Sequence, residues 1–137
     1  MNERLKREGT DDVCARSAGT WAAEGALPPT HTVRVMAERG IDVRGHRAHN
    51  VNVADVAGAL LVLGMTRYHV EVLRLDFAAH ADKILLFSEM AARRFDVPDP
   101  YGSSLASYRQ VANVITTVLD QGYERIMVYL TAEDTVS

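Results

Sequence analysis

An aspartate between two prolines is the residue of this sequence best placed to do chemistry. In the stretch 97–102, Val-Pro-Asp-Pro-Tyr-Gly, Pro98 and Pro100 have fixed φ angles and push the backbone of Asp99 toward extended geometry. Gly102 then allows a sharp turn. The carboxylate is therefore expected on a defined loop, and loops on a rigid scaffold often carry catalytic residues. Taken alone, a Pro-Asp-Pro turn is more often structural than catalytic, so both interpretations stay open.

The single cysteine is the other residue that could act as a nucleophile. Segment 12–17, Asp-Val-Cys-Ala-Arg-Ser, alternates in a way that predicts a short strand, with Cys14 between two apolar neighbours. This position favours a small buried hydrophobe over a reactive thiol. With one cysteine no intramolecular disulfide can form, and a cytoplasmic location is the default.

Two histidines, His46 and His49, are three residues apart and invite a metal interpretation. A protein metal site usually needs a third or fourth ligand at a suitable spacing, and the sequence offers none. We therefore expect no metal and no cofactor.

Apolar periodicity predicts the elements that would position these residues. Strands are expected at 12–17, 60–65 and 83–87, and helices at 1–8, 30–39, 53–56, 67–77 and 105–130. The residues expected to cap helix starts are Thr30, Asn52, Thr66 and Ser103 or Ser104. Gly122 is a point at which the last helix could break or bend.

Strands that alternate with helices predict a parallel sheet in an α/β fold. In such sheets the ligand crevice lies outside the carboxyl ends of the strands. The segments 17–21 and 65–66 and the loop that carries Asp99 all fall at or beyond expected strand ends. We therefore expect them to converge on one cleft.

Several short motifs, taken together, resemble one known family. They are Arg-Ser-Ala-Gly-Thr-Trp at 16–21, Glu-Arg-Gly-Ile-Asp at 38–42, Gly-His-Arg-Ala at 45–48, Met-Thr at 65–66, Asp-Lys-Ile at 82–84 and Asp-Pro-Tyr-Gly at 99–102. In this order and spacing they resemble the low-molecular-weight protein-tyrosine phosphatases, in particular the bacterial tyrosine and arginine phosphatases. The resemblance implies a three-layer α/β sandwich with a short parallel sheet, as a single domain over residues 1–137.

The resemblance also implies a two-step hydrolysis of phosphate monoesters. A cysteine thiolate attacks phosphorus within a loop of pattern Cys, five residues, Arg, and the arginine binds the phosphate oxygens. In this chain the residue at the arginine's spacing from Cys14 is Thr20. We therefore expect the nucleophile loop, and the first strand of the sheet, to lie upstream of Met1, and we expect this chain alone to be inactive.

Three kinds of role follow from the resemblance. Asp99 matches the general acid that protonates the leaving oxygen and then activates water. Trp21 and Tyr101 match aromatic walls beside the phosphoryl-bearing side chain, although both are also compatible with ordinary exposed loop aromatics. Ser17 and His46 match polar residues that brace the phosphate loop.

Composition narrows the range of partners. The chain is 47% hydrophobic with a net charge of -3 and has no basic stripe, so nucleic acid is an unexpected partner. The longest run of apolar residues and glycine, 56–65, is well short of the ~18 residues of a membrane span. We expect no signal peptide, because no charged, apolar, small-residue pattern opens the sequence. The expected partners are a phosphorylated protein or a phosphate ion. A missing strand would also leave a gap that lowers stability or pairs the chain with a second copy.

Two functions stay open at this point. In the first, the full-length protein is a phosphatase acting on phosphotyrosine or phosphoarginine; arsenate reduction, a third activity of this scaffold, would also need the thiol. In the second, the chain is a catalytically dead scaffold that binds a partner. The proton donor Asp99 favours the first, because a protein that only binds needs no acid there.

Overall fold

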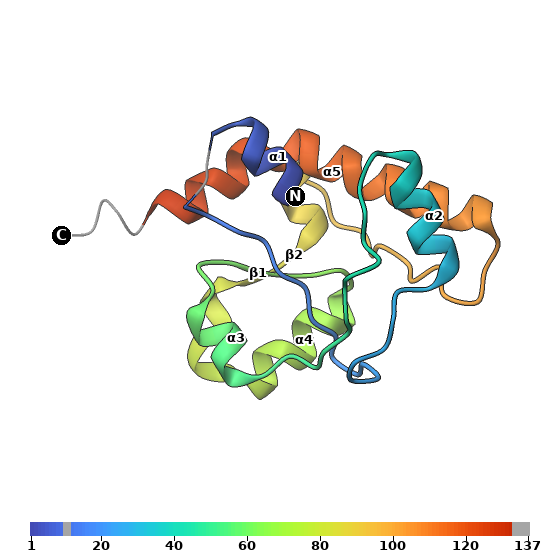
Figure 1. Ribbon diagram of the computed structural model, residues 1–137. Coiled ribbons are helices and arrows are strands. Elements are labelled where there is room, and N and C mark those ends of the chain that lie inside the picture. The colour runs from blue at the N-terminus through green and yellow to red at the C-terminus, as the bar shows by residue number, and fades with distance from the viewer. Residues whose placement is uncertain (10–11, 133–137) are drawn as a thin grey trace.

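The computed structural model describes residues 1–9 and 12–132, and the order of its elements is that of an α/β protein (Figure 1). The elements are α1 (Asn2–Arg7), α2 (Thr30–Glu38), α3 (Val53–Gly58), β1 (Val62–Gly64), α4 (Arg67–Asp76), the 3-10 helix η1 (Ala78–Lys83), β2 (Ile84–Leu86), the 3-10 helix η2 (Phe87–Ala91) and α5 (Leu105–Thr131). Among these residues no helix is both long enough and apolar enough to cross a membrane.

The sheet consists of β1 and β2, which run parallel with Leu63 opposite Leu85. Helix α4 makes the crossover between them, as a parallel pair requires. A Cβ atom on Gly64 would lie 2.8 Å from Cγ2 of Val70, so this glycine allows α4 to pack closely on β1. Two of the three predicted strands, those at 60–65 and 83–87, are therefore confirmed, although each is shorter than predicted.

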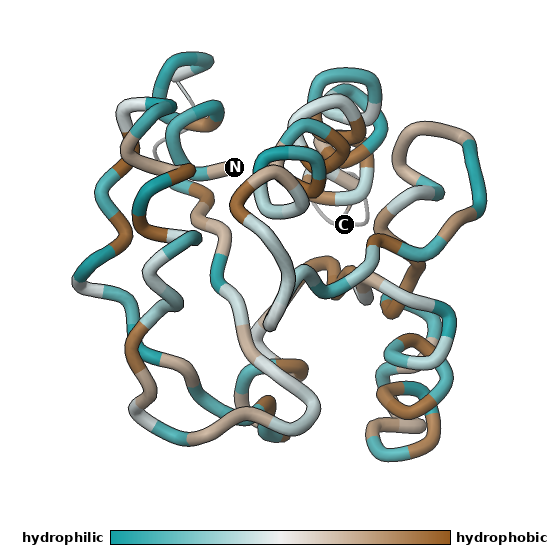
Figure 2. The backbone as a smooth tube through the Cα atoms, turned by 90° about the vertical axis from the view of Figure 1, so that its right-hand side faces the viewer, coloured by the Kyte–Doolittle hydropathy of each residue, from teal (hydrophilic) through white to brown (hydrophobic). Residues whose placement is uncertain are grey.

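Two apolar cores lie on opposite sides of this sheet and make the fold three-layered. The first joins α3, α4 and the strands through Val56, Val70, Leu73, Ile84 and Leu86. The second joins η2 and α5 through Phe87, Met90, Val97, Val118 and Ile126. Figure 1 shows α3 and α4 on one side of the strands and α1, α2 and α5 on the other. Along the helices, hydrophobic and hydrophilic stretches alternate, as expected when one face of each is buried (Figure 2).

The prediction of a strand at 12–17 is wrong. These residues form no strand, and the nearest sheet-like contact is an isolated parallel bridge between Gly19 and Asn50. The backbone of Ala15 is instead hydrogen-bonded by a side chain: Asn2 Nδ2 donates to the Ala15 carbonyl at 2.8 Å, and the Ala15 N–H donates to Asn2 Oδ1 at 2.6 Å. The expectation that Cys14 is buried is wrong as well, because without a strand packed into the sheet its thiol is exposed.

Helix α5 is not broken at Gly122. The helix runs through this residue, which is buried, and a Cβ there would lie 2.7 Å from the carbonyl carbon and oxygen of Met90. The glycine thus lets η2 lie directly against the helix backbone. Close packing, and not a helix break, explains a glycine at this position.

Three of the predicted helix caps are confirmed. Asn52, Thr66 and Ser104 each accept a hydrogen bond from the backbone N–H three residues on. Thr30 does not cap α2, because Pro29 occupies that position and Thr30 is already the first helical residue. The fixed φ of proline suits it to the entrance of a helix.

Candidate functional site

The loop that carries Asp99 is tied to the carboxyl end of β1. The N–H of Val97, a residue only 4% exposed, donates to the carbonyl of Met65 at 2.9 Å. Asp96 Oδ1 accepts from the backbone N–H of Arg67 at 2.9 Å and lies 3.2 Å from its Nε. The backbone hydrogen bond from Arg67 lowers the pKa of Asp96 below its ordinary value. These contacts place the loop beside the crevice edge expected for a parallel sheet.

Asp99 itself is exposed on a compact turn. Its Oδ1 accepts from the N–H of Tyr101 at 3.0 Å, and the N–H of Ser103 donates to the carbonyl of Pro100 at 2.8 Å. Gly102 has φ +78, a left-handed conformation that suits glycine. The other carboxylate oxygen of Asp99 has no partner among the described residues.

The two predicted aromatic walls lie on the surface. Trp21 is 97% exposed and Tyr101 is 77% exposed, and neither ring contacts another ring in the described part of the chain. The loop after Trp21 is fixed at Ala22, whose N–H and carbonyl are both hydrogen-bonded by the side chain of Asn50. The two aromatic residues therefore stand on anchored loops with their rings free to meet a ligand.

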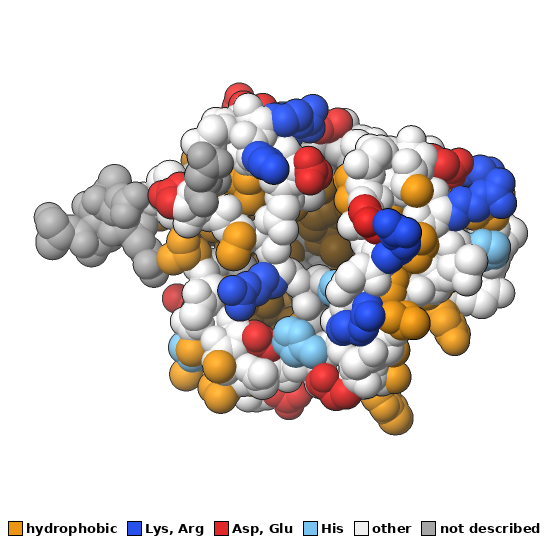
Figure 3. Space-filling model, in the orientation of Figure 1, with side chains coloured by type: hydrophobic (Ala, Val, Ile, Leu, Met, Phe, Trp, Pro, Cys, Tyr) orange, Lys and Arg blue, Asp and Glu red, His pale blue; other side chains and the backbone are white. Residues whose placement is uncertain are grey.

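Ser17 and His46 line one hollow of about 620 Å³, although they come from segments far apart in the sequence. The hollow lies between the start of α1 and segments 15–17 and 46–49; it is lined by Met1, Asn2, Ala15, Arg16, Ser17, His46, Arg47 and His49. On the face drawn in Figure 3, side chains of Lys or Arg, of His and of Asp or Glu lie around a central hollow with an apolar floor. Asp99, Trp21 and Tyr101 do not line it.

A histidine and a carboxylate stabilise one wall of the hollow. His49 Nε2 lies 2.7 Å from Asp55 Oδ2, and the same oxygen accepts from the N–H of Asn52 at 3.0 Å. Asp55 thus completes the capping box of α3. Its hydrogen bond raises the pKa of His49 above the ordinary value, and the bond from His49 lowers the pKa of Asp55.

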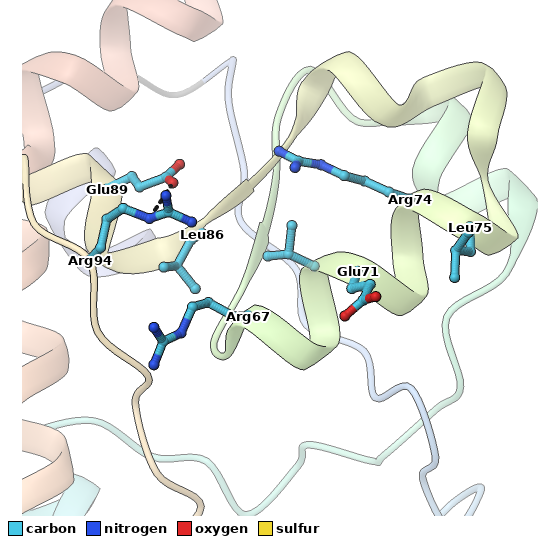
Figure 4. A pocket seen from close by; sticks show the side chains of 8 residues that line it. Arg67, Glu71, Arg74, Leu75, Leu86, Glu89 and Arg94 are labelled. Carbon is cyan, nitrogen blue, oxygen red and sulfur yellow. Dashed lines mark ion pairs between the residues drawn. The ribbon is translucent and has the colours of Figure 1, made fainter.

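A second, smaller cleft of about 280 Å³ lies between α4 and η2 (Figure 4). Arg67 and Arg94 lie on either side of Leu86, and Arg94 pairs with Glu89 at 3.5 Å. Glu71 also lines the cleft, so its charges have both signs. None of the predicted site residues lies here, although Arg67 also holds the loop that carries Asp99 through its hydrogen bond to Asp96.

Cys14 has an exposed thiol and does not line the hollow. Cys14 is the only cysteine of the sequence, and Thr20 stands where an arginine would have to follow it. Within residues 1–9 and 12–132, no three His, Cys, Asp or Glu side chains gather closely enough to hold a metal.

A profile of the family described as low molecular weight phosphotyrosine protein phosphatase matches residues 1–129. The chain belongs to this family. The protein-arginine-phosphatase of Bacillus subtilis is 30% identical over 117 residues, which make up 85% of this chain and 77% of that protein. A probable low molecular weight protein-tyrosine-phosphatase, EpsP of Ralstonia nicotianae, is 29% identical over 126 residues, or 92% of this chain and 86% of that protein.

The fold agrees with the same family. The crystal structure of a low molecular weight protein tyrosine phosphatase from T. tengcongensis superposes with a TM-score of 0.86 at 36% identity, covering 90% of this chain and 84% of that one. The resemblance found in the sequence motifs is therefore confirmed at the level of family and fold.

Several residues that line or support this hollow were not predicted from the sequence to do so. Arg16 and Arg47 line the hollow, and His49 with Asp55 supports its wall. The pair Asn52 and Asp55, three residues apart before an apolar run, carries the signal of a capping box. The two arginines carry no such local signal, because the fold alone brings their segments together.

Proposed function

We propose that this chain is part of a phosphoric monoester hydrolase that acts on phosphorylated tyrosine or arginine side chains of proteins, with Asp99 as general acid and base. The observation that carries the proposal is the anchored loop: Val97 and Asp96 fix it to Met65 and Arg67, while one oxygen of Asp99 stays free. A proton donor must be held within reach of the leaving oxygen, and such a loop does this.

In the proposed reaction Asp99 first gives its proton to the oxygen or nitrogen that leaves phosphorus. It then takes a proton from the water that attacks the cysteinyl phosphate. We propose that the thiolate and the phosphate-binding guanidinium come from a segment outside these 137 residues, and that this chain alone does not turn over substrate. Ser17 and His46 would brace that segment from within the hollow.

The aromatic side chains support a protein substrate. Trp21 and Tyr101 are exposed on fixed loops and could flank the side chain that bears the phosphoryl group. The named relatives include both arginine and tyrosine phosphatases, so both substrates are kept in the proposal. We place the protein in the cytoplasm, where the exposed thiol of Cys14 would stay reduced.

The test is an assay of this chain and of a chimera. The chimera carries, ahead of Met1, the segment of a family relative that contains the Cys-five-Arg loop. With p-nitrophenyl phosphate, we expect no turnover by the 137-residue chain and clear turnover by the chimera. In the chimera, Asp99→Asn should lower kcat by about 10²–10⁴-fold, while Ser103→Ala on the same turn should have little effect.

Two results would contradict the proposal. Turnover by the 137-residue chain that survives Cys14→Ser would mean that another nucleophile is present. A folded chimera that binds phosphate yet shows no turnover would favour a scaffold that only binds a partner.

A further inference from the structure

We propose that the cleft between α4 and η2 binds a small zwitterion, an α-amino acid with an apolar side chain. In the proposed complex the ligand carboxylate lies against the guanidinium groups of Arg67 and Arg94, and its ammonium group lies against Glu71. The ligand side chain covers Leu75 and Leu86. This cleft supplies no group to the proposed hydrolysis, and the proposal does not rest on that function.

Charges of both signs line the cleft in nearly equal number. Its ionisable lining consists of three cations and two anions: Arg67, Arg74, Arg94, Glu71 and Glu89. Just outside the lining, Asp96 adds a negative charge beside Arg67, and Arg125 adds a positive charge beside η2. A concave surface of one sign concentrates ions of the opposite sign, but here the two signs almost cancel. The lining therefore suits a ligand that carries both charges better than it suits a simple anion or cation.

Two of the arginines are held at one end and keep their terminal nitrogens available. The Nε of Arg67 lies 3.2 Å from Asp96 Oδ1, and the Nε of Arg94 lies 3.5 Å from Glu89 Oε1. The terminal nitrogens Nη1 and Nη2 of these two side chains donate no hydrogen bond to any residue that the structure describes. Figure 4 shows the two side chains on either side of Leu86. A guanidinium group that is held in this way matches the two oxygens of a carboxylate.

Glu71 is the group of the cleft that suits an ammonium ion. Within the described parts of the chain, its carboxylate has no hydrogen bond and no ion pair. It follows Arg67 by one turn of α4, so the Cβ atoms of the two residues are expected about 5–6 Å apart on one face of the helix. Arg74 does not neutralise it, because its Nε and Nη2 donate to the carbonyl of Ile84 at 2.9 and 2.6 Å. An α-amino acid has its carboxylate and ammonium groups on one carbon atom, so it can bridge Arg67 and Glu71.

Apolar side chains form the rest of the cleft. Val70 and Leu86 are only 7% and 2% exposed, whereas Leu75 is 75% exposed. A ligand side chain that covers Leu75 would remove apolar surface from water, which favours binding. The cleft has a volume of about 280 Å³, slightly below the range of pockets for drug-sized ligands. Its size therefore suits a smaller molecule such as a single amino acid.

The test is a titration of the isotope-labelled 137-residue chain with L-leucine, followed by amide chemical shifts. We expect saturable shifts at 67–75, 86–89 and 94. Three related probes each lack one group: glycine has no apolar side chain, N-acetyl-leucine has no ammonium group and leucine amide has no carboxylate. Each probe should bind about fivefold or more weakly than leucine, because each loses one of the proposed contacts.

Substitutions in the cleft test the same contacts from the side of the protein. Arg94→Gln and Glu71→Gln should each weaken leucine binding about fivefold or more, because each removes one charged partner. The matched controls are Arg34→Gln on α2 and Glu124→Gln on α5, which remove the same charges from exposed positions outside the cleft. Both controls should leave binding unchanged. Thermal unfolding checks that each variant is folded.

Three results would overturn the proposal. The first is the absence of saturable shifts in the cleft of the wild-type chain. The second is binding of N-acetyl-leucine or of leucine amide as tight as that of leucine, since the site would then take a simple anion or cation. The third is unchanged leucine binding by folded Arg94→Gln and Glu71→Gln variants. No step of this test measures turnover, so the result of the chimera experiment leaves it unaffected.

Discussion

Asp96 accepts a hydrogen bond from the backbone N–H of Arg67 at 2.9 Å and so ties the loop that carries Asp99 to the first turn of α4. The Nε of the same arginine lies 3.2 Å from the same carboxylate oxygen. One carboxylate thereby fixes the loop that carries Asp99 to the helix that packs on both strands. Because the carboxylate carries its charge in the folded state, this link depends on pH.

Asp96→Asn should loosen the loop that carries Asp99 and lower the free energy of unfolding at neutral pH. The pKa of Asp96 is lower in the folded chain than in the unfolded chain. Its contribution to the free energy of unfolding is therefore present above the pKa of the unfolded chain, and it is lost as pH falls through the pKa of the folded chain. We expect the difference in free energy of unfolding between wild type and Asp96→Asn to shrink as pH drops below about 4. Urea denaturation at several pH values measures it. A difference that grows toward low pH would show that the charge is not stabilising.

Gly122→Ala should destabilise the chain by about 1–3 kcal/mol or more, because the new methyl group would meet the backbone of Met90 at 2.7 Å. A backbone neighbour cannot rotate away as a side chain can. The control is Gly58→Ala, where nothing lies within 4 Å of the new Cβ. Urea denaturation of both variants should show a loss only for Gly122→Ala, and equal stabilities would mean that η2 does not pack on α5 as described.

Asn2→Ala should release segment 12–17 from α1. Both backbone groups of Ala15 would lose their partner, at a cost of about 1–2 kcal/mol, and the amide of Ala15 should exchange with solvent faster. Asn2→Asp is the matched comparison, since it keeps the acceptor and loses the donor. Its stability and its Ala15 amide exchange rate should fall between those of the wild type and those of Asn2→Ala. Hydrogen exchange of the Ala15 amide is the measurement. Unchanged protection in Asn2→Ala would mean that the segment is held by other contacts.

The pair of His49 and Asp55 should stabilise the chain most in mildly acidic solution. The pKa of His49 is higher in the folded chain than in the unfolded chain. Its contribution to the free energy of unfolding is therefore present below the pKa of the unfolded chain, and it is lost as pH rises through the pKa of the folded chain. The pKa of Asp55 is lowered, so its contribution is lost at low pH. A double-mutant cycle of His49→Asn and Asp55→Asn should therefore show coupling near pH 5–6 that declines toward pH 9. Coupling that is strongest at pH 9 would contradict this assignment of charges.

The short sheet should make the chain weakly stable or self-associating. In the part of the chain that the structure describes, β1 and β2 pair only with each other, and a two-stranded sheet leaves an open edge on each side. We expect sedimentation velocity to show concentration-dependent association, or urea denaturation to show a midpoint below that of the relatives. A monomer at micromolar concentration with high cooperative stability would contradict both expectations.

Interactions between residues close in the sequence determined much of the secondary structure of this protein. The period of the apolar residues placed α4 and α5, and Asn52, Thr66 and Ser104 fixed three helix starts, because a cap involves residues only three positions apart. The strands at Val62–Gly64 and Ile84–Leu86 were likewise visible as buried apolar runs. The motif around Asp99, together with the other motifs, was sufficient to identify the family, which the profile match over residues 1–129 then confirmed.

Contacts between distant segments were decided only by the tertiary structure. Alternation at 12–17 predicted a strand, but a strand also needs a hydrogen-bonding neighbour, and here Asn2 bonds Ala15 instead. Gly122 looked like a helix breaker until η2 was seen to lie against it. The hollow beside α1 is lined by both Arg16 and Arg47, and no periodicity of the sequence links those residues. A pattern that repeats every two to four residues predicts secondary structure, because it depends on neighbouring residues. A site depends on contacts between segments far apart in the sequence, and only the folded chain brings these together.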